Sequence, residues 1–331
     1  MRASAHLGAV VLALAATACA TVVPAAPRAG AARTVPTEVA AAYRDERPVP
    51  TAARCLHARR PDVETWDVLL PPRTRPDAPA DERAPIVLRW WRPVRAEGRR
   101  PAVVLSPILG NDGTLVADFA QDFARRGWHA LLVLRPDLDV DPARPLVQVE
   151  ERTKAAVVRQ VQALDWLLEQ PDVDPSRVAS FGISAGGIQT AMVAGVDPRY
   201  RAHVIALAGG PLADVLVDSS EGKIRALVAR GLAAEHTDRE GLRARLRGVL
   251  RTDPVALARH VDPDAVLLVL ATRDRSVPTE LGLRLREALG DPETVFVPTG
   301  HYGAFFALPR IRSLVLEFLR RRLEPSPPGG A

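Results

Sequence analysis

The chain has 331 residues, of which 47% are hydrophobic, 25% are charged and 5% are aromatic. This balance is ordinary for a globular protein, and it excludes a collagen, a wholly disordered chain and a protein with many membrane spans. The formal net charge is +5, but the basic residues are spread along the chain among 39 acidic ones, and few aromatic residues are available to stack on bases. The sequence therefore predicts no nucleic-acid partner.

The N-terminus has the pattern of an export signal. An apolar run from Leu7 to Ala18 follows Arg2, and it is shorter than the roughly 20 residues that a membrane-spanning helix needs. The stretch Ala16 to Cys19 (ATAC) offers a cleavage site after residue 18 and also resembles a bacterial lipobox, whose cysteine is lipidated. We expect residues 1–18 to be a signal peptide. The protein is then either freely secreted or anchored to the cell envelope through Cys19, its one expected contact with a membrane.

Residues 19–62 are rich in Ala, Pro and Arg without a sustained period, which predicts a tether or a loosely ordered lead-in. A disordered tail is predicted at 324–331. In the intervening part, residues 63–323, strands are predicted at 63–70, 86–94, 102–109, 128–134, 177–183, 203–208, 265–271 and 294–297. Helices are predicted at 113–126, 149–169, 184–194, 279–289 and 304–323. This alternation predicts an α/β fold with a mostly parallel sheet covered by helices on both faces, and function at the carboxyl ends of the strands.

Residues 210–264 carry no strand signal. Their apolar residues recur at helical spacing, which predicts a helical cap inserted before the strand at 265–271. We expect this cap to form a wall of the substrate pocket. The alternative is a packing appendage that does not touch substrate.

A G-x-S-x-G motif, Gly182-Ile183-Ser184-Ala185-Gly186, stands where a predicted strand ends and a helix begins. A sharp turn at this place lifts a serine hydroxyl above the sheet, and glycines let neighbouring backbone pass close by. The alternative is a glycine-rich turn that binds phosphate at a helix N-terminus. The segment 177–187 (RVASFGISAGG) resembles the α/β-hydrolase family. Within that family the chain is similar to dienelactone-hydrolase-like and acyl-peptidase-like esterases, over residues 63–323.

The resemblance implies a catalytic triad in the chain order Ser, Asp or Glu, His. His301 lies in the loop 298–303 (PTGHYG), where the family places its catalytic histidine, and Asp274 matches the D-x-x-V-P pattern of related hydrolases. We expect Ser184 to attack an acyl carbonyl, His301 to take the proton and Asp274 to orient His301. The rival acids are Asp262, Asp264 and Glu280.

Two backbone N–H groups should bind the oxyanion. The first belongs to Ala185, the residue after the nucleophile. The second should come from the loop after the strand that starts at residue 102. Many relatives carry His-Gly in this loop, whereas this chain has Ser106-Pro107-Ile108-Leu109. Proline has no N–H, so Ile108 is our first choice for this donor and Leu109 our second.

These features predict an exported serine hydrolase that cleaves small-molecule carboxylic esters through an acyl-enzyme intermediate. No metal or cofactor is expected, since neither a zinc-ligand spacing nor a dinucleotide-binding glycine motif is present. The alternatives are a short-peptide peptidase of the same fold and a relative that binds a ligand without catalysis.

Overall fold

The computed structural model describes residues 20–27, 32–74, 78, 80–94, 98–110, 114–135 and 145–324. The predicted signal peptide, Cys19 and residues 325–331 of the predicted tail lie outside the described residues. Among the described helices, none has both the length and the apolar character needed to cross a membrane.

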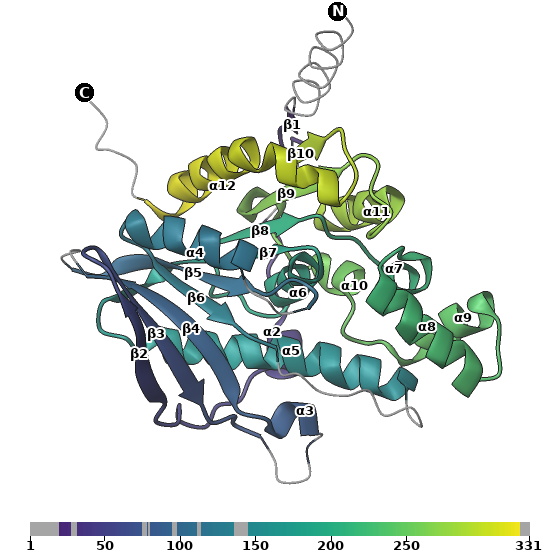
Figure 1. Ribbon diagram of the computed structural model, residues 1–331, viewed down its shortest axis with the longest axis horizontal. Coiled ribbons are helices and arrows are strands. Elements are labelled where there is room, and N and C mark those ends of the chain that lie inside the picture. The colour runs from purple at the N-terminus through teal and green to yellow at the C-terminus, as the bar shows by residue number, and fades with distance from the viewer. Residues whose placement is uncertain are drawn as a thin grey trace, which may run out of the picture.

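A twisted sheet of ten strands runs through the described part of the molecule (Figure 1). Its order is β1-β10-β9-β8-β7-β5-β6-β4-β3-β2. Strands β5 to β10 pair in parallel, and antiparallel strands complete both edges. The bounds are β1 Thr21–Val23, β2 Ala53–Arg59, β3 Val63–Leu70, β4 Ile86–Pro93, β5 Arg100–Ser106, β6 His129–Val133, β7 Val173–Ile183, β8 Ala202–Ala206, β9 Val266–Ala271 and β10 Glu293–Val297.

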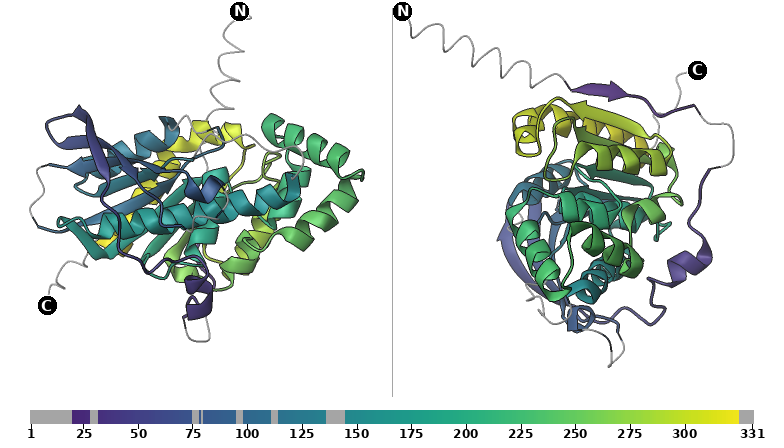
Figure 2. Two further views of the ribbon diagram at one scale, coloured as in Figure 1. Left: turned by 90° about the horizontal axis from the view of Figure 1, so that it is seen from below. Right: turned by 90° about the vertical axis from the view of Figure 1, so that its right-hand side faces the viewer.

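Helices cover both faces of this sheet, as the alternating pattern predicted (Figures 1 and 2). Helices α4 (Thr114–Arg125) and α12 (Leu308–Leu323) cover one face, where Phe119 and Phe318 are fully buried. The other face carries α5 (Pro145–Leu168), α6 (Ala185–Ala194), α10 (Pro254–Ala258) and α11 (Thr279–Leu289). Between β8 and β9 the chain is helical, with α7 (Leu212–Asp218), α8 (Gly222–Ala234) and α9 (Arg239–Val249) before α10 and the short 3₁₀ turn η1 (Pro263–Ala265).

The segment expected to be a tether is partly built into the fold. Strand β1 pairs with β10, β2 pairs with β3, and the short helix α2 (Thr37–Ala41) lies between β1 and β2. Outside this segment, the short helix α3 (Ala80–Arg83) precedes β4. The expectation of a loosely ordered lead-in is therefore wrong for these strands. The physical reason is that both are edge strands, and every side chain of β2 is exposed, so no alternation of apolar and polar residues marks it.

The closing helix expected at 304–323 is divided. A 3₁₀ helix, η2 (Tyr302–Ala307), leads into α12, whose first turn contains Pro309. Proline fits the first turn of an α-helix because the amide N–H groups there have no intrahelical acceptor. The tighter η2 turn directly follows His301 and so fixes the loop that carries this residue.

We expect the free energy of unfolding to depend on pH because of the buried histidine His203. This β8 residue is buried, Ser180 Oγ lies 2.8 Å from its Nδ1, and burial lowers its pKa to about 4. In the unfolded chain His203 becomes protonated below about pH 6.5, whereas in the folded protein it stays neutral until about pH 4. The unfolded state therefore binds more protons between these two pH values, and the free energy of unfolding falls as the pH decreases through this window. We expect this histidine to account for a loss of about 3 kcal/mol in the free energy of unfolding.

Denaturant unfolding of the wild type and His203→Gln across this pH window measures the effect. The glutamine variant should show the smaller decrease, with part of the dependence remaining because burial also lowers the pKa of His129. Equal slopes for the two proteins would contradict the assignment to His203.

Candidate active site

Ser184 lies at a strained turn between β7 and α6. Its backbone has φ 58° and ψ −124°, in the region that favours glycine, and such a residue costs about 1–3 kcal/mol. The strain is held in place because Ser184 N–H donates to Ala206 O (2.8 Å) on the neighbouring strand. The turn therefore projects the serine beyond the carboxyl end of the sheet, as the G-x-S-x-G motif predicted.

The glycines on either side of Ser184 permit close backbone packing. A Cβ atom on Gly182 would lie 2.1 Å from Gly186 O, and one on Gly186 would lie 2.5 Å from Ser106 O. The second contact shows that the loop after β5 runs directly against the serine turn. Strands β5 and β7 are neighbours where the order of the sheet reverses, which is where α/β sheets open a crevice for ligands.

The structure brings the three predicted triad residues into one hydrogen-bonded chain. Ser184 Oγ lies 2.9 Å from His301 Nε2, and His301 Nδ1 lies 2.6 Å from Asp274 Oδ2. The side chains of His301 and Asp274 are 9% and 3% exposed, so water scarcely reaches their contact. A serine hydroxyl, an imidazole and a carboxylate in this order can pass a proton from the hydroxyl to the ring.

The surroundings of Asp274 determine which imidazole nitrogen carries the proton. Oδ1 of Asp274 accepts the backbone N–H groups of Ser276 (2.9 Å) and Val277 (3.0 Å), which leaves Oδ2 to accept from His301. The proton of neutral His301 is therefore assigned to Nδ1, and Nε2 is free to accept from Ser184. Of the three rival acids, Asp262 instead caps η1, by accepting from the backbone N–H of Asp264.

Buried amide and hydroxyl groups fix the end of β5, from which the next loop starts. Ser106 Oγ donates to Gln160 Oε1 (2.7 Å), which also accepts from Gln189 Nε2 (2.9 Å), and Thr190 Oγ1 donates to Ser106 Oγ (3.2 Å). These contacts join α5 and α6 to the loop that the sequence marked for the second oxyanion donor. No sequence motif marks this network, because its members lie on three separate elements.

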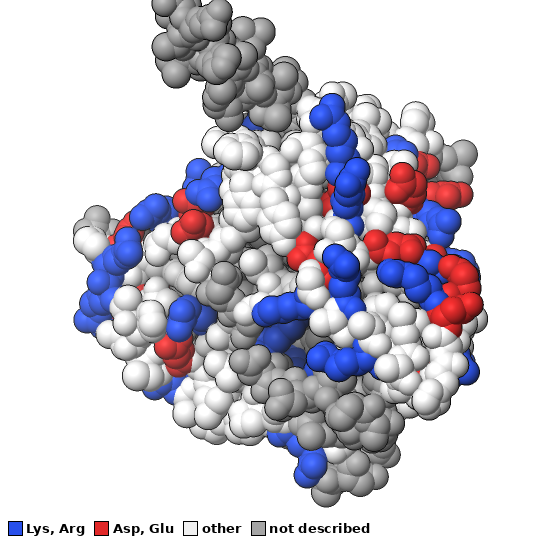
Figure 3. Space-filling view, turned by 45° about the vertical axis from the view of Figure 1, so that its right-hand side comes forward, with Lys and Arg blue, Asp and Glu red and all other residues white. Residues whose placement is uncertain are grey.

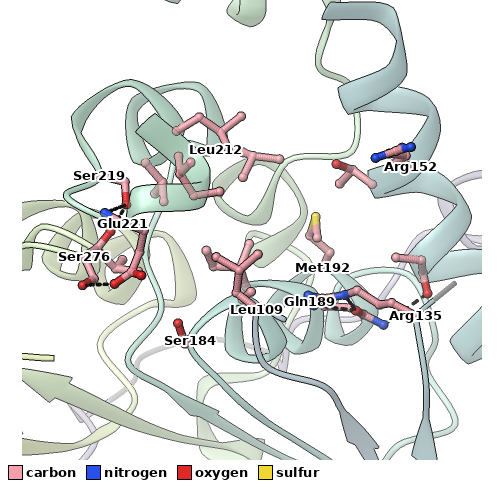
Figure 4. A pocket seen from close by; sticks show the side chains of 18 residues that line it. Leu109, Arg135, Arg152, Ser184, Gln189, Met192, Leu212, Ser219, Glu221 and Ser276 are labelled. Carbon is pink, nitrogen blue, oxygen red and sulfur yellow. Dashed lines mark hydrogen bonds between the residues drawn. The ribbon is translucent and has the colours of Figure 1, made fainter. Parts of the chain in front are cut away.

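Two cavities meet at Ser184. Pocket A, about 300 Å³, lies over α6 and receives side chains from the predicted cap (Figure 4). Ser184 faces this pocket, with Glu221 and Ser276 on one side and Gln189 and Arg135 on the other. Its apolar lining comprises Leu109, Ala156, Ala185, Ile188, Met192, Leu212, Val215, Leu216, Ile224 and Val277. Helices α7 and α8 therefore wall the pocket, rather than forming a distant appendage.

Pocket B, about 400 Å³, shares Leu109, Ser184 and Glu221 with pocket A and is the cavity that His301 lines. Its wall comes mainly from β8, β9, η2 and the start of α12, with the loop after β5 closing it. The apolar side chains that line it are Ile108, Leu109, Leu115, Ile183, Ala206, Leu207, Val269, Ala304, Phe305, Leu308 and Ile311.

Glu221 lines both pockets and ties three loops together. It precedes α8, and its carboxylate accepts from Tyr302 Oη (2.8 Å to each oxygen) and from Ser276 Oγ. The hydrogen bond to Glu221 also raises the pKa of the Tyr302 hydroxyl. The cap is thereby joined to the loops that carry Asp274 and His301. The sequence analysis did not predict the contacts of Glu221, and no local sequence pattern indicates them.

Comparisons with known proteins give partial matches along the chain. A model of the prolyl oligopeptidase family matches residues 148–296. Over 97 residues the chain is 34% identical to an uncharacterised protein of Mycobacterium tuberculosis (strain H37Rv), a match that covers 29% of this chain and 32% of that protein. The chain thus spans about a third of the length of this curated relative.

Solved structures share the fold. An acetyl xylan esterase from Paenibacillus sp. R4 superposes with a TM-score of 0.66 and 19% identity, over 88% of this chain and 96% of the esterase. The acylaminoacyl peptidase of Pyrococcus horikoshii superposes with a TM-score of 0.54 and 14% identity, over 86% of this chain and 52% of the peptidase. With the strand order, these likenesses show that the chain has the α/β-hydrolase fold, which the esterase and the peptidase share.

Proposed function

We propose that this protein is a serine hydrolase that cleaves small-molecule carboxylic esters through an acyl-enzyme intermediate. The observation that carries the proposal is the chain of hydrogen bonds from Asp274 through His301 to Ser184, at the meeting point of two apolar pockets. A site that only bound a ligand would not require a strained serine within 2.9 Å of a base oriented by a buried carboxylate.

The proposed reaction has two half-reactions. Ser184 Oγ attacks the ester carbonyl while His301 Nε2 takes its proton. The oxyanion accepts hydrogen bonds from the backbone N–H of Ala185 and from one N–H of the loop after β5, for which Ile108 is the first choice and Leu109 the second. His301 then gives the proton to the leaving alkoxide, which departs as an alcohol. Water attacks the acyl-enzyme, its proton passes to His301, and the acid leaves as Ser184 recovers its proton.

We use the position of His301 to propose which part of the substrate each pocket holds. The leaving oxygen must receive a proton from His301, so the alcohol part of the substrate lies in pocket B, which His301 lines. The acyl part then extends from Ser184 into pocket A. Because both pockets are lined mainly by apolar side chains, we infer a substrate that is apolar on both sides of the ester.

A short-peptide peptidase is the second candidate, favoured by the match to the prolyl oligopeptidase family. Against it stands the lining of the pockets. Among the described residues, Glu221 is the acidic side chain that lines them, and it is engaged by Tyr302 and Ser276 rather than free to bind a peptide amino group. Turnover of a p-nitrophenyl ester and a p-nitroanilide with the same acyl group decides between the two. Faster cleavage of the anilide would overturn the ester assignment.

Filling pocket A is expected to shorten the preferred acyl chain. Leu216 contributes to this pocket from α7, and Leu216→Trp would occupy part of its 300 Å³. We expect kcat/KM for a hexanoate ester to fall about tenfold or more relative to the acetate ester, because each excluded methylene forfeits apolar burial. Steady-state kinetics on p-nitrophenyl esters of increasing acyl length measure the change.

The matched control is Leu308→Trp, which fills pocket B instead. This variant should keep the acyl preference and lose turnover of esters with bulky alcohols. If Leu308→Trp alone shortened the preferred acyl chain, the acyl part would have to be assigned to pocket B and the alcohol part to pocket A.

We also propose that the protein is exported, with Cys19 either lipidated or left near a cleavage site. Support comes from the sequence of residues 7–19. Mass spectrometry of the protein from its native host tests this, with a mature N-terminus at or just after Cys19 expected. Full-length protein that still carries Met1 would contradict the proposal.

A further inference from the structure

Exposed aromatic side chains follow His301 directly. Tyr302, Phe305 and Phe306 of η2 are 63%, 49% and 68% exposed, and we call them the η2 aromatic patch. Among the described residues, no other aromatic side chain is as exposed as these three. Phe305 also lines pocket B, so the patch borders the opening where the alcohol part of a substrate would enter. Large apolar side chains gathered at one place on a surface mark an interaction site.

Basic side chains without an acidic partner border the same patch. Lys223 lines pocket B together with Tyr302 and Phe305, and with Glu221, whose carboxylate accepts from Tyr302. Arg310 follows the patch in the first turn of α12. Arg273 lies beside the histidine loop, where its N–H donates to Thr299 O (3.0 Å). All three side chains are exposed, and none forms an ion pair with a described residue, whereas many arginines elsewhere in the described part of the chain do.

The distribution of charge is visible in the space-filling view. On the face that Figure 3 shows, Lys and Arg side chains lie near the centre with Asp and Glu side chains beside them, and white surface lies above. An aromatic patch next to unpaired cations is the combination found at membrane interfaces, where rings enter the acyl boundary and cations meet phosphate groups.

The described chain also begins near this patch. In the register of β1 with β10, Thr21 pairs with Phe296, and β10 ends at Val297 shortly before His301. Residue 20 therefore lies at the carboxyl end of the sheet, and Figure 2 shows the start of the described chain beside the yellow C-terminal elements.

We propose that the end of the molecule carrying the η2 aromatic patch docks on an anionic lipid surface. Phe305 and Phe306 enter the interface, and Lys223, Arg273 and Arg310 contact the headgroup phosphates. Pocket B then opens toward the bilayer, so an apolar ester dissolved in the membrane reaches Ser184 without crossing water. A second copy of the chain fits less well, because a two-fold interface would bring the unpaired cations of both copies together. The docking needs no catalysis, and only the route of the substrate rests on the proposed function.

The first experiment asks which face touches the bilayer, using the full-length chain with Ser184→Ala to prevent lipid hydrolysis. Phe306→Trp and, as a matched control, Leu283→Trp on α11 are bound to vesicles of phosphatidylglycerol and phosphatidylcholine in equal parts, with brominated acyl chains. Leu283 is 44% exposed and lies on the helix layer of the opposite face. We expect the bromines to quench the fluorescence of the tryptophan introduced at position 306 and not that of the tryptophan introduced at position 283. Because both proteins share the same N-terminus, equal quenching would overturn the proposal.

The second experiment measures affinity for the same vesicles and for phosphatidylcholine alone. Phe306→Ser should weaken binding to the mixed vesicles about tenfold, through lost apolar burial. Arg310→Glu should weaken it about fivefold or more on mixed vesicles and leave binding to phosphatidylcholine unchanged. Unchanged affinity of both variants, or a dimer in gel filtration that Phe306→Ser dissolves, would overturn lipid docking.

Turnover of water-soluble p-nitrophenyl acetate separates the two proposals. Phe306 does not line either pocket, so Phe306→Ser should keep wild-type turnover of this ester while losing vesicle affinity. If instead Ser184→Ala retained ester turnover, the proposed function would fail while the vesicle measurements still decided the docking.

Discussion

Replacing Ser184 with alanine is expected to lower kcat for p-nitrophenyl acetate by about 10⁴- to 10⁶-fold. The reason is that alanine removes the oxygen that His301 Nε2 holds at 2.9 Å, while the other groups of the site stay in place. Labelling by a fluorophosphonate gives a second measurement. In the wild type the Ser184 oxygen displaces fluoride from phosphorus and the protein gains the phosphonyl mass, and Ser184→Ala should gain none.

The control is Ser313→Ala, which removes an exposed hydroxyl of α12 that bonds only to Pro309 O (3.0 Å) among its described contacts. This variant should keep wild-type turnover and full labelling. Wild-type turnover by Ser184→Ala would place any activity at another site, and the ester-hydrolase proposal would then be wrong. Unfolding curves for both variants show whether a loss of activity reflects a loss of structure.

The central fold could be predicted because its signals are local. Strands such as β5 and β9 are continuous apolar runs buried on both faces, and the helices between them have an apolar stripe. The two outer strands of the lead-in, β1 and β2, escaped prediction because edge strands need no buried face. Tyr43 illustrates the difficulty. It is buried and hydrogen-bonded to Thr252, which lies more than 200 positions away, and no residue near Tyr43 in the sequence indicates this contact.

The candidate site was predictable to the extent that its residues stand in short motifs. The backbone conformation of Ser184 follows from the glycines around it, and the loop positions of Asp274 and His301 follow from where strands end. Glu221 stands in no motif. Its contacts with Tyr302 and Ser276 depend on how the cap packs against the sheet. The packing of the cap depends on contacts between residues far apart in the chain, which cannot be read from a single sequence.

Replacing Asp274 with asparagine is expected to lower kcat about 10⁴-fold while leaving the fold intact. The two ends of an asparagine amide are not equivalent, and the surroundings choose its orientation. The backbone N–H groups of Ser276 and Val277 require an acceptor, so the amide oxygen should take the place of Oδ1. The NH₂ group then faces His301 Nδ1, which must accept a hydrogen bond there instead of donating one.

This reversal moves the imidazole proton of His301 from Nδ1 to Nε2, where it faces Ser184 and cannot accept the serine proton. Nitrogen NMR of labelled His301 should therefore show the protonated nitrogen change from Nδ1 to Nε2 in Asp274→Asn, a signature that a purely structural role would not produce. Asp262→Asn, at the η1 cap, is the control and should alter neither the tautomer nor kcat. An active Asp274→Asn enzyme with its Nδ1 proton retained would mean that a different acid orients the histidine, and the triad would have to be reassigned.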